Sequence, residues 1–284
     1  NVISQGGLGG SSQNAGGAGT MYLYNRTTTQ GQIRMDNTDR PLGGNVGHAP
    51  LSGTFSVPIT MQRGLARIGQ GTSLADVSFD SATVIASDDF SAQNLNLTNN
   101  TLLTHDVASD VTSSKLNITA TNVTIDGSSR IDVSERGLPN GNAVTNRSGG
   151  SHAGRGGLYS NGATNAPYGN PLMPTEFGTG GAATASRGGG VIKLTATSLQ
   201  LDGQIFANGS TAIGGGSGGS IWLVVQSLSG TGTITSNGGG ETSASGGGGG
   251  GRIAIEYSNS TFDLLANVIS QGGLGGSSQN AGGA

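Results

Sequence analysis

The sequence has no cysteine, only two lysines, few aromatic residues and no long apolar run. Without cysteine, the chain forms no disulfide and offers no thiolate to a metal ion. Charged residues make up 10% of the chain and aromatic residues 4%, so a conventional aromatic-rich core is excluded. A formal charge of -3, with lysine only at Lys115 and Lys193, gives no basic surface, so we expect no nucleic-acid partner. No run approaches the ~18 apolar residues of a membrane span, and we expect no transmembrane segment and find no export signal.

Repetition is the main feature that is present. Residues 267–284 read NVISQGGLGGSSQNAGGA, and residues 1–18 read the same, so the sequence returns to its start at Asn267. An identity of this length indicates that the chain holds one repeat unit, 1–266, plus an overlap. The units are then either consecutive in one chain or separate subunits that stack.

A shorter period relates 189–209 to 218–238 without gaps. It places Ile192 on Ile221, Leu194 on Leu223 and Leu199 on Leu228. The same template fits 115–134 and 250–273 with small insertions. The last strand of 250–273 is the NVISQGG that also opens the chain, so the coil that begins near Gly250 is completed by the opening residues of the next unit. Residues 18–37 are then the following coil, for which we predict that Met21, Leu23, Ile33 and Met35 point inward.

Within each copy, apolar and polar residues alternate, and the phase changes once. Alternation predicts strands, and the phase change predicts a corner, with about three short strands per coil separated by Asp-Gly, Gly-Thr-Gly or Asn-Gly. Coils of about 22 to 32 residues with matched inward positions predict an all-β, right-handed parallel β-helix of about seven to nine coils, with an axial repeat of ~35 to 45 Å. We also predict an amide ladder of Asn208, Asn237 and Gln271.

The glycine tracts 214–219 and 246–251 recur just before the first strand of a coil. Flexible linkers are one interpretation of such tracts. Because the tracts hold a fixed place in the coil, we favour an ordered, glycine-walled side of the helix, in which the absence of Cβ allows close approach. Residues 38–82 fit the template poorly and are interpreted as an irregular coil or side loop. Residues 135–187 are interpreted as a long loop excursion, which is a candidate for ligand or inter-fibre contact.

The tracts GGGVIKLTATSLQLDGQIFANGS and GGGSGGSIWLVVQSLSGTGTITSNGGG, with GGSHAGRGG before them, resemble the glycine-rich tandem repeats of giant secreted bacterial surface proteins of adhesin-like β-helical type. The likeness covers roughly residues 115–273. It implies an extracellular, stalk-like or adhesive role and carries no catalytic residue.

Candidate chemistry is sparse. Asp126 and Asp202 could begin a carboxylate column like that of polysaccharide-active β-helices, but the later coils do not maintain it, so Asp-Gly turns are the simpler interpretation. The histidines, His48, His105 and His152, are far apart in sequence and show no metal or catalytic spacing. We expect that the protein is not an enzyme and that it holds no cofactor. Calcium is the one candidate ligand, at the acidic pairs Asp88 with Asp89 or Asp36 with Asp39.

Two sets of residues are candidates for assembly. The end-to-end contact between identical units is assigned to Asn1, Val2, Ile3, Val268, Ile269 and Gln271. A lateral strip is assigned to Lys193, Trp222, Tyr22 and Tyr24, since outward positions of the first strand stack as Lys193, Trp222, Ala254 and then Tyr22 of the next unit. A lysine that only covers its neighbouring indole would explain the first two equally well.

These observations predict a structural repeat unit of an extracellular or cell-surface fibre. Its partners would be identical units end to end, with lateral bundling of fibres. An adhesin stalk or passenger that binds carbohydrate or another cell is the alternative, and a polysaccharide-active β-helix enzyme is a third.

Overall fold

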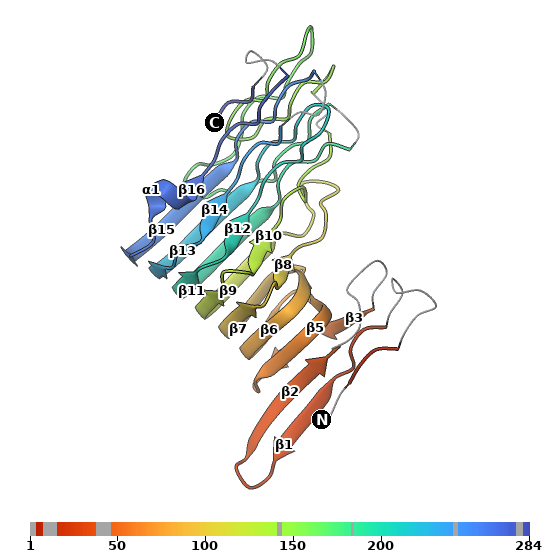
Figure 1. Ribbon diagram of the computed structural model, residues 1–284, viewed down its shortest axis with the longest axis vertical. Coiled ribbons are helices and arrows are strands. Elements are labelled where there is room, and N and C mark those ends of the chain that lie inside the picture. Colours follow the sequence, from red (N-terminus) through yellow and green to blue (C-terminus); the bar gives the residue numbers. More distant parts are fainter. Residues whose placement is uncertain are drawn as a thin grey trace.

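The computed structural model describes residues 4–7, 16–37, 47–140, 144–182, 185–240, 244–276 and 281–284. Over these ranges the chain is all-β, with sixteen strands and one helix of four residues (Figure 1). The N-terminal elements are β1 (Met21–Asn25), β2 (Gln30–Asp36), β3 (His48–Leu51), β4 (Thr54–Phe55), β5 (Ile59–Ile68), β6 (Thr72–Ala86), β7 (Asp88–Thr98) and β8 (Leu102–Thr104). The C-terminal elements are β9 (Leu116–Ile125), β10 (Arg130–Asp132), β11 (Val191–Leu201), β12 (Gln204–Phe206), β13 (Ser220–Ser229), β14 (Thr233–Thr235), β15 (Arg252–Ser260), α1 (Leu264–Asn267) and β16 (Val268–Ile269).

The strands form one large sheet that coils around an axis, as in a parallel β-helix. One ladder of parallel strands runs β2-β5-β6-β7-β9-β11-β13-β15, and a second runs β3-β5-β6-β8-β10-β12-β14-β16. Each ladder therefore has eight rungs in the described residues, within the predicted range. Since parallel strands hydrogen-bond to the rungs above and below, the backbone bonds run along the axis.

The core is built from columns of apolar side chains, one from each rung. The sequence-derived pairings Ile192 on Ile221, Leu194 on Leu223 and Leu199 on Leu228 are confirmed. Two columns illustrate the stacking: Met35, Met61, Phe79, Leu97, Ile125 and Leu201 in the first ladder, and Ala49, Ala66, Val84, Leu103, Ile131, Ile205 and Ile234 in the second. Every one of these side chains is almost completely buried, so the columns make one continuous core.

The predicted corner inside each coil is a bend rather than a break. In β9 the alternation of buried and exposed residues changes phase at Thr121 and Asn122, which are both exposed, yet the strand continues through them. Two of the three predicted strands are thus one long strand. This explains why β9, β11 and β13 have 10 or 11 residues whereas β10, β12 and β14 have three.

The interpretation of 38–82 as an irregular coil or side loop is wrong for its described part, where β3 to β6 form regular rungs. Paired residues are 17 to 19 positions apart there: Ala49 with Ala66, Ala66 with Val84 and Val84 with Leu103. These coils are shorter than the template of the later coils because they turn sharply, with Arg63 and Gly64 at positive φ, and because they contain no glycine tract. The longer template therefore does not match them.

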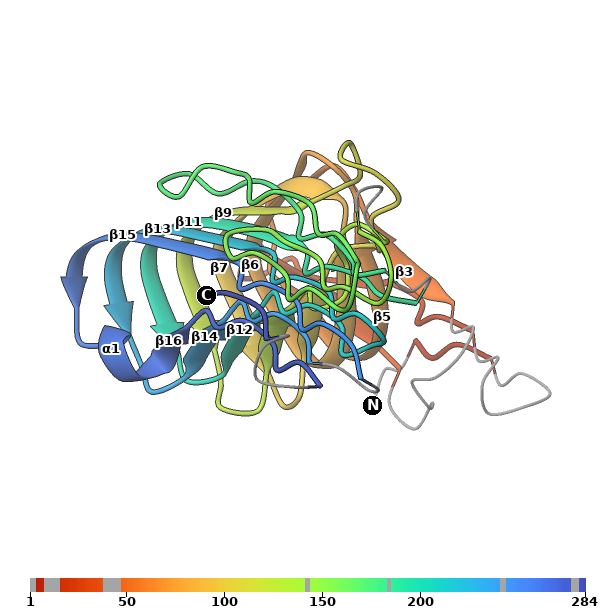
Figure 2. The same cartoon turned by 90° about the horizontal axis from the view of Figure 1, so that it is seen from above.

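The glycine tracts pack side by side on one flank of the coils (Figure 2). Gly248 N donates to the Gly239 carbonyl at 2.9 Å, and Gly249 N donates to the Gly150 carbonyl at 2.9 Å. Because consecutive residues bond to different neighbours, the segments form a bundle rather than a flat sheet. A Cβ on Gly248 would lie 1.9 Å from the Gly216 carbonyl oxygen, so only glycine allows this approach. We call this array the glycine bundle.

The long excursion contributes to the glycine bundle. Gly150 N donates to the Gly215 carbonyl, and Gly178 N donates to the Gly189 carbonyl, both at 2.9 Å. Arg252 anchors the excursion to the sheet, since its guanidinium donates to the Tyr168 carbonyl at 2.7 and 3.0 Å. The described portion of 135–187 is therefore packed against the coils.

Candidate assembly interface

The N-terminal end of the sheet is a hairpin. The prediction that 18–37 forms a parallel coil with Met21 and Leu23 inward is wrong for this chain, because β1 pairs antiparallel with β2, with Tyr22 opposite Ile33. Ile33 and Met35 are buried as predicted, whereas Leu23 is 37% exposed. Among the described residues, β1 pairs only with β2.

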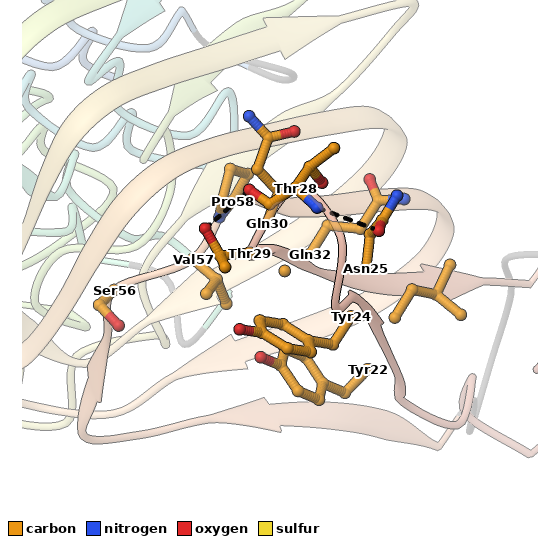
Figure 3. A pocket seen from close by; sticks show the side chains of 12 residues that line it. Tyr22, Tyr24, Asn25, Thr28, Thr29, Gln30, Gln32, Ser56, Val57 and Pro58 are labelled. Carbon is orange, nitrogen blue, oxygen red and sulfur yellow. Dashed lines mark hydrogen bonds between the residues drawn. The ribbon is translucent and has the colours of Figure 1, made fainter.

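The hairpin exposes aromatic side chains beside an open groove (Figure 3). Tyr22 and Tyr24 are 59% and 51% exposed, and their rings stack with centroids 6.2 Å apart. The groove has a volume of about 960 Å³ and lies between the hairpin and residues 56–58. The lateral residues Tyr22 and Tyr24 are therefore accessible, as a contact strip requires.

At the C-terminal end, β15 is the outer strand of the sheet and pairs only with β13 among the residues that the structure describes. Ile221 and Leu223 on β13 are fully buried, whereas their partners Ile253 and Ile255 on β15 are only partly buried. A hollow of about 340 Å³ lies beside this edge and is lined by Ile253, Val268 and Ala284, among other residues. The apolar columns thus end at an open face.

The described parts of the duplicated segment make matching contacts at both ends of the chain. Gly16 N donates to the Gly7 carbonyl at 2.8 Å, and Gly282 N donates to the Gly273 carbonyl at 2.9 Å, which is the same bond shifted by one repeat. A Cβ on Gly6 would meet the Gly16 oxygen at 1.8 Å, and a Cβ on Gly272 would meet the Gly282 oxygen at 2.0 Å. The described residues of the two copies, 4–7 with 16–18 and 270–276 with 281–284, therefore share these glycine contacts, and we call this pair of segments the glycine turn.

The two copies of this turn have neighbours on opposite sides. The C-terminal copy packs on the preceding coil, where Gly273 N donates to the Gly248 carbonyl at 2.7 Å. The N-terminal copy packs on the following coil, where a Cβ on Gly17 would lie 2.5 Å from the Gly47 oxygen. Each copy thus lacks the neighbour that the other copy has.

The C-terminal assembly residues form the last rung. Val268 pairs with Ile234 and Ile269 with Thr235 in β16, and Gln271 N donates to the Asn237 Oδ1 at 2.8 Å. The predicted amide ladder therefore has a different form, because Asn208 Oδ1 likewise accepts from Asn237 N at 2.7 Å. Each asparagine side chain bonds to the backbone of the next rung. Asn1, Val2 and Ile3 lie outside the described residues.

The other lateral residues stack in the predicted order, Lys193 beside Trp222 and Trp222 beside Ala254. The Lys193 ammonium lies 4.3 Å from the centre of the indole, and the Trp222 Nε1 donates to Glu256 at 2.9 Å. The indole is thus held by its own neighbours, which agrees with the simpler interpretation of a cation–π pair.

The acidic residues that were candidates for calcium binding make hydrogen bonds or ion pairs with other residues of the chain. Asp88 accepts from Lys115 N at 3.0 Å and from Ser114 at 3.1 Å, and Asp89 accepts from Asn117 at 2.8 Å. Asp36 is paired with Arg34 at 3.1 Å, and Asp39 lies outside the described residues. Among the residues that the structure describes, no three metal-ligating side chains come together.

Two histidines are buried, which nothing in the sequence pattern indicated. His105 Nδ1 donates to the Asp106 carbonyl at 2.6 Å, and its Nε2 accepts from Val191 N at 3.2 Å, so the ring is held neutral. Burial lowers the pKa of His105 to about 4. His152 Nδ1 donates to the Gly218 carbonyl at 2.9 Å, and burial lowers its pKa to about 4 as well. His105 thus joins the start of β11 to Phe177 of the excursion, whose ring lies 5.9 Å away, and His152 joins the excursion to the glycine tract before β13.

The fold defines the class of this protein: an all-β protein whose large parallel sheet coils in the manner of a parallel β-helix. The described residues contain no helix with the length and hydropathy needed to cross a membrane. Comparison with known protein families, with curated proteins and with solved structures gives no match.

Proposed function

We propose that this chain is a structural repeat unit of an extracellular fibre, a right-handed parallel β-helix that continues from one unit into the next. One observation carries the proposal: the described parts of the two copies make the same glycine contacts, and one copy packs on the preceding coil while the other packs on the following coil. If the two copies are one and the same turn in the fibre, that turn has a coil on each side. The last coil of one unit is then followed directly by the first coil of its successor.

Edge physics supports this continuation. An unpaired parallel edge leaves backbone donors and acceptors without partners and invites pairing with another chain. Among the described residues, β15 and β1 are the outer strands at opposite ends, and both carry partly exposed apolar residues, Ile253 and Ile255 on one and Leu23 on the other. The extracellular setting and the absence of enzymatic activity rest on the resemblance of the glycine tracts to secreted bacterial repeats.

An adhesin stalk is the second candidate, and one observation favours it. The excursion is packed against the coils but displays Leu172 and Met173, which are 74% and 50% exposed. Exposed apolar side chains on a rigid loop suit a contact surface. Binding of a glycan or cell that is lost in the variant Leu172→Ser/Met173→Ser would support this role, whereas unchanged binding would exclude this loop.

Truncation after residue 266 tests the fibre. A chain of residues 1–266 lacks β16 and the last glycine turn, and residues 1–18 of a second molecule have the sequence that fills this place. We expect residues 1–266 to form end-to-end assemblies by sedimentation and electron microscopy, and the full chain to form far fewer because its own residues 267–284 occupy the place. The peptide NVISQGGLGGSSQNAGGA, added in excess, should shorten the assemblies, and a scrambled peptide should not. A folded, monomeric 1–266 that ignores the peptide would refute the proposal.

A further inference from the structure

The geometry of the last coil indicates how the strand that follows it is aligned. In the preceding coil, Gly218 N donates to the Gly249 carbonyl at 3.0 Å. Three residues after Gly218 is Ile221, four residues after Gly249 is Ile253, and these two are paired in the sheet. The glycine bond thus precedes the strand pairing by a fixed number of residues.

The same bond is present one coil later. Gly250 N donates to the Gly283 carbonyl at 2.8 Å. Three residues after Gly250 is Ile253, and Gly283 corresponds to Gly17 in the duplicated segment, so four residues further on is Met21 of the next copy. The rule from the preceding coil therefore aligns Met21 with Ile253, Tyr22 with Ala254 and Leu23 with Ile255.

This alignment extends two core columns. The column Leu116, Ile192, Ile221, Ile253 continues in Met21, and the column Ile118, Leu194, Leu223, Ile255 continues in Leu23. The hollow lined by Ile253 and Val268 adjoins Ala284, from which Thr20 and Met21 of the next copy follow within three residues. The strand that follows Ala284 would thus cover the partly buried Ile253 and Ile255 and the hollow beside them.

The hairpin is incompatible with this arrangement, because β1 cannot keep its place against β2. In β11 the two halves of the strand lie on either side of the bend and do not pair with each other. β2 already occupies the second half of its coil, with Ile33 on Ile59, and β4 occupies the first half of the next coil, with Phe55 on Leu74. The vacant rung for β1 is therefore beside β4, where the groove next to Val57 and Pro58 is open (Figure 3).

We infer that β1 exchanges partners on assembly: it leaves the antiparallel hairpin with β2 and becomes a parallel rung on β15 of the preceding copy, with Tyr22 on Ala254. This inference rests on the proposed function and adds the partner strand and its alignment. In the unassembled unit, the hairpin covers the edge of β2, and β1 is the outer strand until a second copy of this chain is present.

Cysteine pairs test the exchange cleanly because the chain has no cysteine. The experiment uses a chain that contains two copies of the unit, residues 1–266 followed by residues 1–284. Ala254→Cys in the first copy and Tyr22→Cys in the second are ~4.8 Å apart in the inferred alignment, within disulfide reach, whereas Tyr24→Cys is two residues out of alignment and beyond the limit of about 7 Å. We expect mild oxidation to link the first pair roughly tenfold faster than the control pair.

A second pair reports the hairpin. Leu23 lies opposite Gln32 in the antiparallel pairing, so Leu23→Cys/Gln32→Cys closes only while β1 remains on β2. This disulfide should form in the first copy of the two-copy chain and be suppressed in the second. If it forms equally fast in both copies and Tyr22→Cys does not link to Ala254→Cys, the exchange is wrong. Assembly of residues 1–266 alongside that result would leave the fibre intact and reject only the exchange, whereas failure to assemble would reject both.

Discussion

Adjacent glycines in one tract of the glycine bundle should respond in opposite ways to a single methyl group. A Cβ on Gly239 would lie 1.9 Å from the Ser210 oxygen and 2.3 Å from the Ser210 carbonyl carbon. A Cβ on the next residue, Gly240, has its nearest contact at 3.8 Å, with the Leu274 oxygen. Neither glycine has a positive φ, so the pair isolates the effect of close packing from that of backbone conformation.

The cost at Gly239 follows from the bonds that must move. The Ser210 carbonyl accepts from Gly216 N at 2.9 Å, and Gly239 N donates to the Gly216 carbonyl at 2.8 Å. The two backbones must separate by more than about 1 Å to admit the methyl group, and each buried hydrogen bond that is lost costs about 1 to 1.5 kcal/mol. Alanine also restricts the unfolded chain, which offsets about 0.4 to 1 kcal/mol. We expect Gly239→Ala to lower the free energy of unfolding by about 2 kcal/mol and Gly240→Ala to leave it unchanged or slightly raised.

Urea denaturation followed by circular dichroism measures the difference. The midpoint should shift to lower urea for Gly239→Ala at an unchanged slope, and it should stay in place for Gly240→Ala. Equal midpoints for the two variants would show that the tracts are not closely packed. A larger loss of stability in Gly240→Ala than in Gly239→Ala would show that the close backbone contact is at Gly240 rather than at Gly239.

Three further predictions concern the core, the rungs and the buried histidine. Phe79→Ala, at a fully buried position between Met61 and Leu97, should cost about 3 to 5 kcal/mol in urea denaturation, while Tyr24→Ala at the exposed hairpin should cost far less. Asn237→Leu removes the Oδ1 that accepts from Gln271 N and should cost about 1 kcal/mol, whereas Asn237→Asp keeps an acceptor and should cost less, and equal losses would refute the role of that oxygen. Because burial lowers the pKa of His105 from 6.5 to about 4, the unfolded state takes up the proton first, so stability is full above pH 6.5 and falls by about 3 kcal/mol as the pH approaches 4. His105→Gln does not titrate at this position and should show a shallower loss over that range, and an NMR titration that gives His105 an ordinary pKa would contradict the reasoning.

The regular part of the fold could be predicted from the sequence because its evidence is repeated. Each inward position between Leu116 and Ile255 recurs a coil later, so strand pairing follows from aligning the sequence with itself. The position of the glycine tracts on one side of the coils could be predicted for the same reason, since a tract precedes the first strand each time. The strand pairing could therefore be predicted in the region where each rung has side chains of the same kind as the rung before it.

The rest had no repeat to reveal it. The coils from Ala49 to Leu103 have a shorter period and no glycine tract, so the longer template does not match them. The hairpin of β1 could not be foreseen, because the alternation of Met21 to Tyr24 is the same in a hairpin as in a parallel rung. The contacts of His105 with Val191 join residues 86 positions apart, a separation that no local pattern encodes.

The change in coil length along the unit has a mechanical consequence. The rungs from Ala49 to Leu103 belong to the short coils, which contain no glycine tract of their own, whereas the later strands β11, β13 and β15 are each preceded by a tract of the glycine bundle. Tension applied along the axis pulls directly on the hydrogen bonds between rungs, which open one rung at a time. Such a chain would unfold first at its short N-terminal coils and release a short length of backbone as each rung opens. Each unit would therefore extend stepwise under load, beginning at a defined site.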